Sequence, residues 1–177
     1  ALASPVVYFF CLKDYQRARL LIFLNPYRDP LGEGYNVIQS TIAVGSGKLF
    51  GKGLVHGTQG QLNFLPAHHT DFIFSVVGEE LGFIGAIAVL MAFFFIVSRC
   101  IAAAQQAKDV YGRLVASGVA SMLLFHILVN VGMTMSAMPV TGIPLPFISY
   151  GGSSLMANLA AIGLVLNIHM RRQRILF

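Results

Sequence analysis

The sequence predicts an all-α, polytopic membrane protein. We expect about three complete transmembrane helices, the end of a fourth, and a large extracytoplasmic loop that contains a short amphipathic helix. Hydrophobic residues make up 56% of the 177 residues and charged residues only 11%, whereas soluble domains carry about 25% charged residues. Residues 114–170 contain no Asp, Glu, Lys or Arg, which excludes a nucleic-acid-binding protein with a basic helix.

The first twelve residues are apolar, with neither an initiator Met nor a basic start, so they do not resemble a signal peptide. They are expected to be the end of a transmembrane helix (1–12), which makes the sequence the C-terminal part of something larger. Cys11 and Cys100 both lie in apolar surroundings. Their spacing fits no metal or redox motif, so they are expected to be buried, unreactive thiols.

Residues 13–70 are expected to form the large outer loop, because Lys13 to Arg19 ends the apolar start and turn-forming residues follow at 25–34. Within this loop, residues 36–44 place Val37, Ile38, Ile42 and Ala43 on one helical face, with Gln39, Ser40 and Thr41 pointing elsewhere. This pattern predicts a short amphipathic helix that Gly45-Ser46-Gly47 ends. It could lie on the bilayer or pack on the protein, and the sequence favours packing.

Six glycines occur in the sixteen residues 45–60, together with Lys48 and Lys52. Such a segment can bring backbone amides close to an anion, although the P-loop motif is absent. Two interpretations remain open: a loop that faces a phosphate, and a flexible surface loop with solvated lysines.

Three apolar runs predict complete spans, at residues 71–98, 114–138 and 153–170. Ser153 or Ser154 is expected to cap the last span. The connection 99–113 and the C-terminus each hold three basic residues, whereas the proline-rich loop 139–152 holds none. The positive-inside rule therefore predicts a cytoplasmic C-terminus and places residues 13–70 outside, although that long loop itself holds six basic residues.

Polar residues gather at the start of the first complete span. Thr70 is a candidate N-cap, which would make Asp71 the first helical residue. Asp71 then has two interpretations: a carboxylate that supports the helix dipole, or a catalytic or metal-binding carboxylate at the outer membrane boundary. Eight residues of straight helix rise about 12 Å, too far for Asp71 and Glu79 to form an acid–base pair. Glu79 and Glu80 are therefore expected to be structural.

His68 and His69 precede this span, and one of them could bond near Asp71; solvated histidines are the alternative. His126 and Asn130 lie four residues apart in the second span, where interhelical hydrogen bonding is the expected role. No Ser-His-Asp arrangement is supported, and these residues do not complete a metal-ligand set.

Three long motifs, in this order, resemble the SEDS family (RodA, FtsW, SpoVE). They are residues 25–47, 57–83 and 142–155. Gly57-Thr58-Gln59 and Thr141, where division-type members often carry Lys, are closer to the rod-shape branch, RodA.

The resemblance implies an inverting peptidoglycan glycosyltransferase of the bacterial inner membrane, active on the extracytoplasmic face, that polymerises lipid II with a class B penicillin-binding protein as partner. It makes Asp71 the catalytic base or the ligand of a divalent cation, Mg²⁺ or Mn²⁺. A transporter that flips the lipid-linked precursor is the alternative. The family has ten membrane helices, so this chain alone is expected to be inactive. Candidate substrate-binding residues in the glycine-rich loop and the motifs are Lys48, Lys52, Gln59, Gln61, His69, Thr70, Ser149, Tyr150, Gly151, Gly152 and Ser153.

Overall fold

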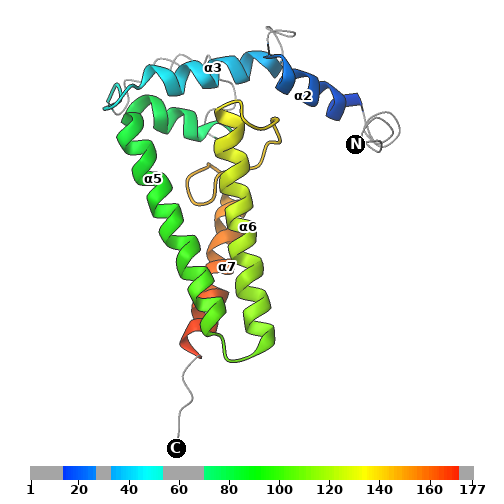
Figure 1. Ribbon diagram of the computed structural model, residues 1–177, viewed down its shortest axis with the longest axis vertical. Coiled ribbons are helices and arrows are strands. Elements are labelled where there is room, and N and C mark those ends of the chain that lie inside the picture. The colour runs from blue at the N-terminus through cyan, green and yellow to red at the C-terminus, as the bar shows by residue number, and fades with distance from the viewer. Residues whose placement is uncertain (1–13, 27–32, 54–69, 172–177) are drawn as a thin grey trace, which may run out of the picture.

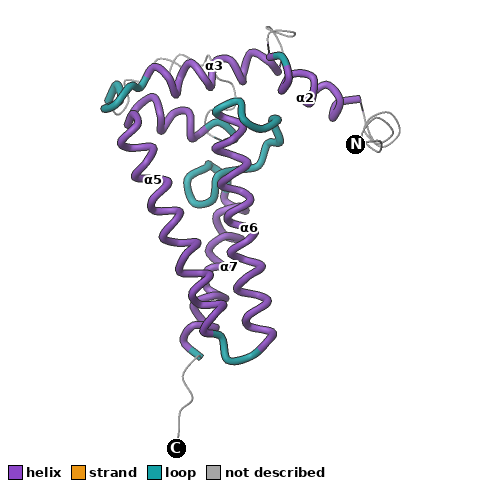
Figure 2. Tube along the Cα trace, viewed as in Figure 1, coloured by secondary structure: helices purple, strands orange, loops and turns teal. Residues whose placement is uncertain are grey.

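The computed structural model describes residues 14–26, 33–53 and 70–171, and these residues are helical apart from their connections (Figure 1, Figure 2). The helices are α2 (Asp14–Leu24), α3 (Glu33–Ser46), α5 (Ile73–Gln106), α6 (Val110–Thr134) and α7 (Gly152–Met170). Helices α5, α6 and α7 are long and apolar enough to cross a membrane. The predicted all-α class and its three spans are confirmed. The predicted helix end at 1–12 lies outside the described residues.

The three long helices form a bundle, and α2 and α3 lie across one end of it (Figure 1). The two surface helices contact each other, and α3 also packs on α5 and α6. The predicted packing of the amphipathic helix on the protein is therefore confirmed. Helix α2 was not predicted from the sequence.

The buried face of α3 differs from the predicted one. Val37 and Ala43 are buried as expected, but Ile42 is 48% exposed and Ser40 is fully buried. Ser40 Oγ donates to the carbonyl of Thr134 at 2.7 Å and lies 2.8 Å from Ser75 Oγ. Because these hydrogen bonds satisfy the hydroxyl, a polar side chain is tolerated where α3, α5 and α6 meet.

Helix α5 bends at Gly82, where φ is 68° and ψ is −165°. Glycine adopts positive φ at little cost because it has no Cβ. The part before Gly82 lies beneath α3, and the part after it runs along the bundle (Figure 1). The predicted single span 71–98 is therefore wrong in shape. It consists of a short segment under α3, followed by a longer segment that continues to Gln106.

The turn after α3 supplies the hydrogen-bond partners that this bend requires. A straight helix would join the amides of residues 83 and 84 to the carbonyls of residues 79 and 80. Instead, the amides of Lys52 and Gly53 donate to the carbonyls of Glu79 and Glu80, both at 3.0 Å, and the amides of Phe83 and Ile84 donate to the carbonyls of Lys48 and Leu49 at 2.8 and 3.2 Å. All four backbone groups are thus satisfied at the bend.

Two glycine pairs bring the turn and α5 into backbone contact. A Cβ added at Gly47 would overlap the carbonyl of Gly78, and a Cβ added at Gly82 would overlap the amide of Gly51. Close backbone packing therefore accounts for Gly47 and Gly51 in the described part of the glycine-rich loop.

Small side chains line the packed core of the bundle. Cys100, Ala103 and Ala104 of α5 pack with Ala116 and Ala120 of α6 in one buried cluster. Small residues let membrane helices approach closely, which favours dispersion contacts. Cys100 is a buried free thiol, as expected; Cys11 lies outside the described residues.

The helix boundaries correct two further expectations. Asp109 caps α6 by accepting from the amide of Gly112 at 2.7 Å, so this span starts at Val110 rather than Leu114 and ends at Thr134. Helix α7 is preceded by Gly151, without a side-chain cap. The predicted Ser153 or Ser154 cap is wrong, because the helix already begins at Gly152.

Candidate functional site

Asp71 lies in the turn at residues 70–72, immediately before α5. The helix begins at Ile73, its N-cap is Phe72, and no side chain caps it. Thr70 is therefore not the N-cap and Asp71 is not the first helical residue, which corrects both expectations. The physical reason is that bonds from distant elements, rather than a local cap, hold the backbone before α5.

Two side chains hold the carbonyl groups of this turn. Ser149 Oγ donates to the carbonyl of Thr70 at 2.7 Å, and Asn130 Nδ2 donates to the carbonyl of Asp71 at 2.9 Å. Asn130 lies on α6 and is fully buried, whereas Ser149 lies in the proline-rich loop. The backbone on each side of the Asp71 Cα is therefore fixed from outside its own helix.

The same two side chains also organise the proline-rich loop. Asn130 Nδ2 donates a second hydrogen bond, to the carbonyl of Ile143 at 2.8 Å. Ser149 Oγ accepts from the amide of Leu145 at 2.7 Å. The turn that carries Asp71 and the loop opposite it are thus fixed by shared anchors, so their relative position is set by α6.

The carboxylate of Asp71 is partly buried and faces Gly142 of this loop. A Cβ added at Gly142, where φ is +72°, would lie 3.4 Å from Asp71 Oδ2. The absence of a side chain at residue 142 leaves the carboxylate open on that side. Gly142 was not among the predicted site residues, although a glycine between the prolines of loop 139–152 is a signal of a special backbone position.

Lys52 and Glu79 form an ion pair away from this turn. Lys52 Nζ donates to Glu79 Oε1 at 2.7 Å; the side chain of Glu79 is fully buried and that of Lys52 is 30% exposed. The contact joins the turn after α3 to α5, which is consistent with the structural role expected for Glu79. In this geometry the Lys52 charge is directed at a carboxylate, while Lys48 is exposed. Glu80 is partly buried.

The remaining candidates are distributed differently from the expectation. Tyr150 is 83% exposed, and Gly152 and Ser153 are exposed at the start of α7. Asn130 bonds to the backbone of a turn and a loop rather than to another helix. His126 Nδ1 is buried and has no hydrogen-bond partner among the described residues. Gln59, Gln61, His68 and His69 lie outside the described residues.

A divalent cation at this turn would have the Asp71 carboxylate as a ligand. Within residues 14–26, 33–53 and 70–171, no three His, Cys, Asp or Glu side chains form a group that could hold a metal ion. Mg²⁺ is commonly held by one or two carboxylates together with substrate phosphates and water. Among the described residues, Asp71 fits that arrangement as a single protein ligand rather than as part of a site of three or more protein side chains.

Comparison with known proteins identifies the family. The family model described as FtsW/RodA/SpoVE cell cycle protein matches residues 1–174. The chain belongs to this family. Within the FtsW/RodA/SpoVE proteins, it is 47% identical over 169 residues to "Peptidoglycan glycosyltransferase MrdB" of Escherichia coli K12, which covers 96% of this chain and 46% of MrdB. It is 50% identical over 161 residues to "Peptidoglycan glycosyltransferase RodA" of Treponema pallidum, which covers 91% of this chain and 37% of that protein.

Two solved structures share the fold. A chain from a study of structural coordination of polymerization and crosslinking by a peptidoglycan synthase complex has a TM-score of 0.77 and 40% identity, over 98% of this chain and 47% of that one. The crystal structure of the Thermus thermophilus rod shape determining protein RodA has a TM-score of 0.58 and 32% identity, over 98% of this chain and 63% of that one. The chain thus spans about half the length of the curated relatives it matches and is a multi-pass membrane protein.

Proposed function

We propose that the intact protein is a peptidoglycan glycosyltransferase that polymerises lipid II into glycan strands for cell elongation, with Asp71 as its catalytic residue. The observation that carries the proposal is the fixed position of Asp71. Asp71 lies in the turn immediately before α5, and the carbonyls on both sides of its Cα are anchored by Ser149 and Asn130. The 47% identity to a protein named as a peptidoglycan glycosyltransferase supports the reaction class.

In this proposal, Asp71 is the general base. A hydroxyl of the acceptor sugar attacks the anomeric carbon of the donor, and Asp71 takes the hydroxyl proton. The bond between that carbon and the diphosphate oxygen breaks, and the lipid-linked diphosphate leaves with the electron pair. One displacement inverts the anomeric centre. A fixed carboxylate suits this step because general-base catalysis requires hydrogen-bond reach of the proton.

A divalent cation would supply charge neutralisation at the diphosphate. Asp71 is the described residue that would hold it, together with the substrate phosphates. The proposed location is the bacterial cytoplasmic membrane, with Asp71 extracytoplasmic and the C-terminus cytoplasmic. A class B penicillin-binding protein is the proposed partner, which the likeness to a chain from a peptidoglycan synthase complex supports. The 177-residue chain alone, at 46% of the length of MrdB, is expected to be inactive.

The test is polymerisation of lipid II by the purified intact protein. Asp71→Asn keeps the shape of the side chain and removes its basicity, so glycan formation should fall at least about 100-fold. Asp109→Asn is the matched control, because it removes a carboxylate from the other end of the bundle and Asn also caps helices. Normal glycan polymer from Asp71→Asn protein would overturn the role of Asp71. Lipid translocation without polymer would favour the transporter instead.

A further inference from the structure

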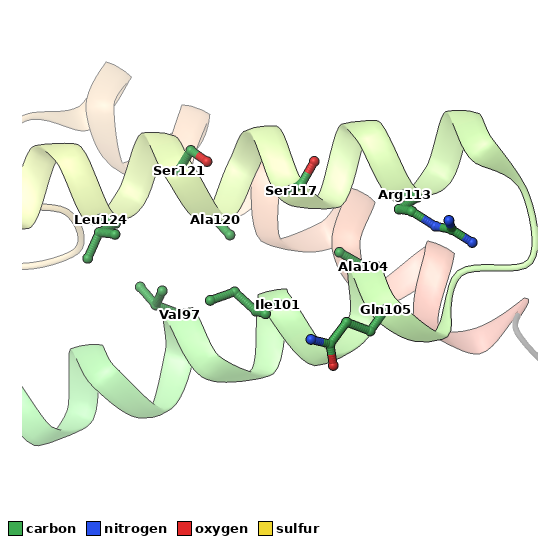
Figure 3. Close-up of a pocket in the computed structure, with 9 residues that line it drawn as sticks. All are labelled: Val97, Ile101, Ala104, Gln105, Arg113, Ser117, Ala120, Ser121 and Leu124. Atoms are coloured by element: carbon green, nitrogen blue, oxygen red, sulfur yellow. The ribbon is translucent and has the colours of Figure 1, made fainter.

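A cavity lies between α5 and α6 at the end of the bundle far from Asp71. It measures about 280 Å³ and is lined by Val97, Ile101, Ala104, Gln105, Arg113, Ser117, Ala120, Ser121 and Leu124. Figure 3 shows Val97, Ile101, Ala120 and Leu124 along the facing sides of the two helices, with Arg113 and Gln105 next to the connection. The cavity is therefore mainly apolar along its length, where Ser117 and Ser121 are the polar lining residues, and it carries Arg113 and Gln105 at one end.

This polar end lies at the opposite membrane face from Asp71. From Phe83 to Gln105, α5 rises about 33 Å, which matches the roughly 30 Å hydrocarbon core of a bilayer. A lipid-linked substrate held at Asp71 therefore has its diphosphate in the other leaflet. A lipid that enters this cavity would therefore come from the leaflet opposite Asp71, whose headgroups lie near Arg113.

The charge around Arg113 favours an anion. Arg113 has no ion-pair partner among the described residues, and the Asp109 carboxylate accepts from the amide of Gly112 as the helix cap. Arg113 also lies in the first turn of α6, where the helix dipole disfavours a cation and favours an anion. Arg99 and Lys108 add positive charge at this end and are both exposed. An anion at the polar end would thus offset both the unfavourable position of the Arg113 cation at the start of α6 and the repulsion between the cations at this end.

We propose that this cavity binds an anionic glycerophospholipid of the leaflet opposite Asp71. The lipid phosphate accepts hydrogen bonds from the Arg113 guanidinium, whose planar fork matches phosphate oxygens, and from the Gln105 amide. One acyl chain lies along the apolar wall between Val97 and Leu124. A zwitterionic lipid fits less well, because its headgroup brings a second cation next to Arg113. The site requires no glycosyltransferase activity, so it stands apart from the role of Asp71.

The experiment counts the lipids that the intact protein retains. The protein is reconstituted in equal amounts of palmitoyl-oleoyl phosphatidylglycerol and palmitoyl-oleoyl phosphatidylcholine, extracted in detergent, and examined by mass spectrometry of the retained lipids. The wild type should retain phosphatidylglycerol over phosphatidylcholine. Arg113→Gln should lower phosphatidylglycerol retention about fivefold, the scale of one cation at an anionic membrane surface. The Lys108→Gln variant, which lacks an exposed cation outside the cavity, should retain as much phosphatidylglycerol as the wild type.

Leu124→Trp tests the cavity itself, because it fills the space without changing any charge, at a position that is 44% exposed and so tolerates bulk. It should also lose the retained lipid while unfolding at the wild-type temperature. Equal retention of the two lipids by the wild type would overturn the proposal. Retention of neither lipid would also overturn it, and is the result expected if another protein segment covers the cavity. Equal losses in Arg113→Gln and Lys108→Gln would indicate diffuse surface charge. Wild-type retention by Leu124→Trp would show that the cavity is not the site.

Discussion

The side-chain amide of Asn130 donates to the backbone carbonyl of Asp71 at 2.9 Å, across 59 residues of sequence. A residue inside a membrane-spanning helix thereby sets the position of the candidate catalytic residue in a turn. The same amide group donates to the carbonyl of Ile143. Asn130 therefore links the turn to the proline-rich loop and fixes their relative position.

Asn130→Leu should lower both stability and polymerisation. The substitution keeps the approximate volume but leaves the carbonyls of Asp71 and Ile143 without their donor, at about 1–3 kcal/mol for each buried group left unsatisfied. Ser149→Ala, which frees the carbonyl of Thr70 and the amide of Leu145, should have a smaller effect in the same direction, because Ser149 is only partly buried and water can replace its bonds. Thermal unfolding in detergent and lipid II polymerisation at saturating substrate are the measurements.

Ser117→Ala is the control for this pair, because among the described residues the Ser117 hydroxyl bonds within its own helix, to the carbonyl of Leu114. It should leave both measurements unchanged. Full polymerisation by Asn130→Leu protein, measured below its unfolding temperature, would contradict a positioning role.

Gly142→Ala should reduce polymerisation more than stability. The positive φ at residue 142 strains any residue with a Cβ by about 1–2 kcal/mol, and the added methyl would lie 3.4 Å from Asp71 Oδ2. That distance is ordinary contact, so the carboxylate is crowded rather than displaced from the fold. Gly163→Ala, where nothing lies within 4 Å of the added Cβ, should keep wild-type activity. Equal activity of the two variants would show that the space beside Asp71 is not used.

Removing Lys52 should destabilise the protein more than removing the charge of Glu79. Lys52→Met leaves a fully buried carboxylate without this ammonium group and should destabilise the protein by a few kcal/mol. The loss should be smaller than the roughly 3–5 kcal/mol of a completely buried pair, because the Lys52 side chain is 30% exposed and its charge is partly screened by solvent. Glu79→Gln should cost less, since the lysine can turn toward water. Thermal unfolding of both variants decides this, and a larger loss for Glu79→Gln would contradict the predicted order.

Gly82→Ala should destabilise the bend of α5. An added Cβ would overlap the amide of Gly51, and φ at residue 82 is +68°. The strain is about 1–2 kcal/mol from the dihedral alone, and moving the turn would also break the four hydrogen bonds at the bend. Gly118→Ala on α6, with open space around its Cβ, should be neutral or stabilise by up to about 1 kcal/mol. Similar unfolding temperatures for the two variants would argue against the bend as observed.

Metal removal should stop polymerisation if the proposed cation acts with Asp71. Treatment with a strong chelator should abolish glycan formation, and added Mg²⁺ or Mn²⁺ should restore it without changing the unfolding temperature, because the described residues offer no protein-only metal site. Polymerisation that is insensitive to the chelator would leave Asp71 as a base alone.

Much of the fold could be predicted because the bilayer imposes a strong compositional rule. The three spans follow from uncharged runs, since a segment in lipid must be apolar and satisfy its own backbone. The bend at Gly82 could not be predicted from this rule. Its hydrogen bonds come from the turn at 48–53, and helical periodicity in one segment carries no information about partners in another.

At the candidate site, the sequence by itself determined which carboxylate lies at a span boundary; that Glu79 is too far from Asp71 to form an acid–base pair stays a prediction. Only the tertiary structure decided that Asp71 precedes its helix and that Asn130 and Ser149 anchor it. The physical reason is that local propensity sets helices and spans, whereas the position of a turn depends on hydrogen bonds between segments 59 and 79 residues apart. Those bonds exist only after the helices have packed.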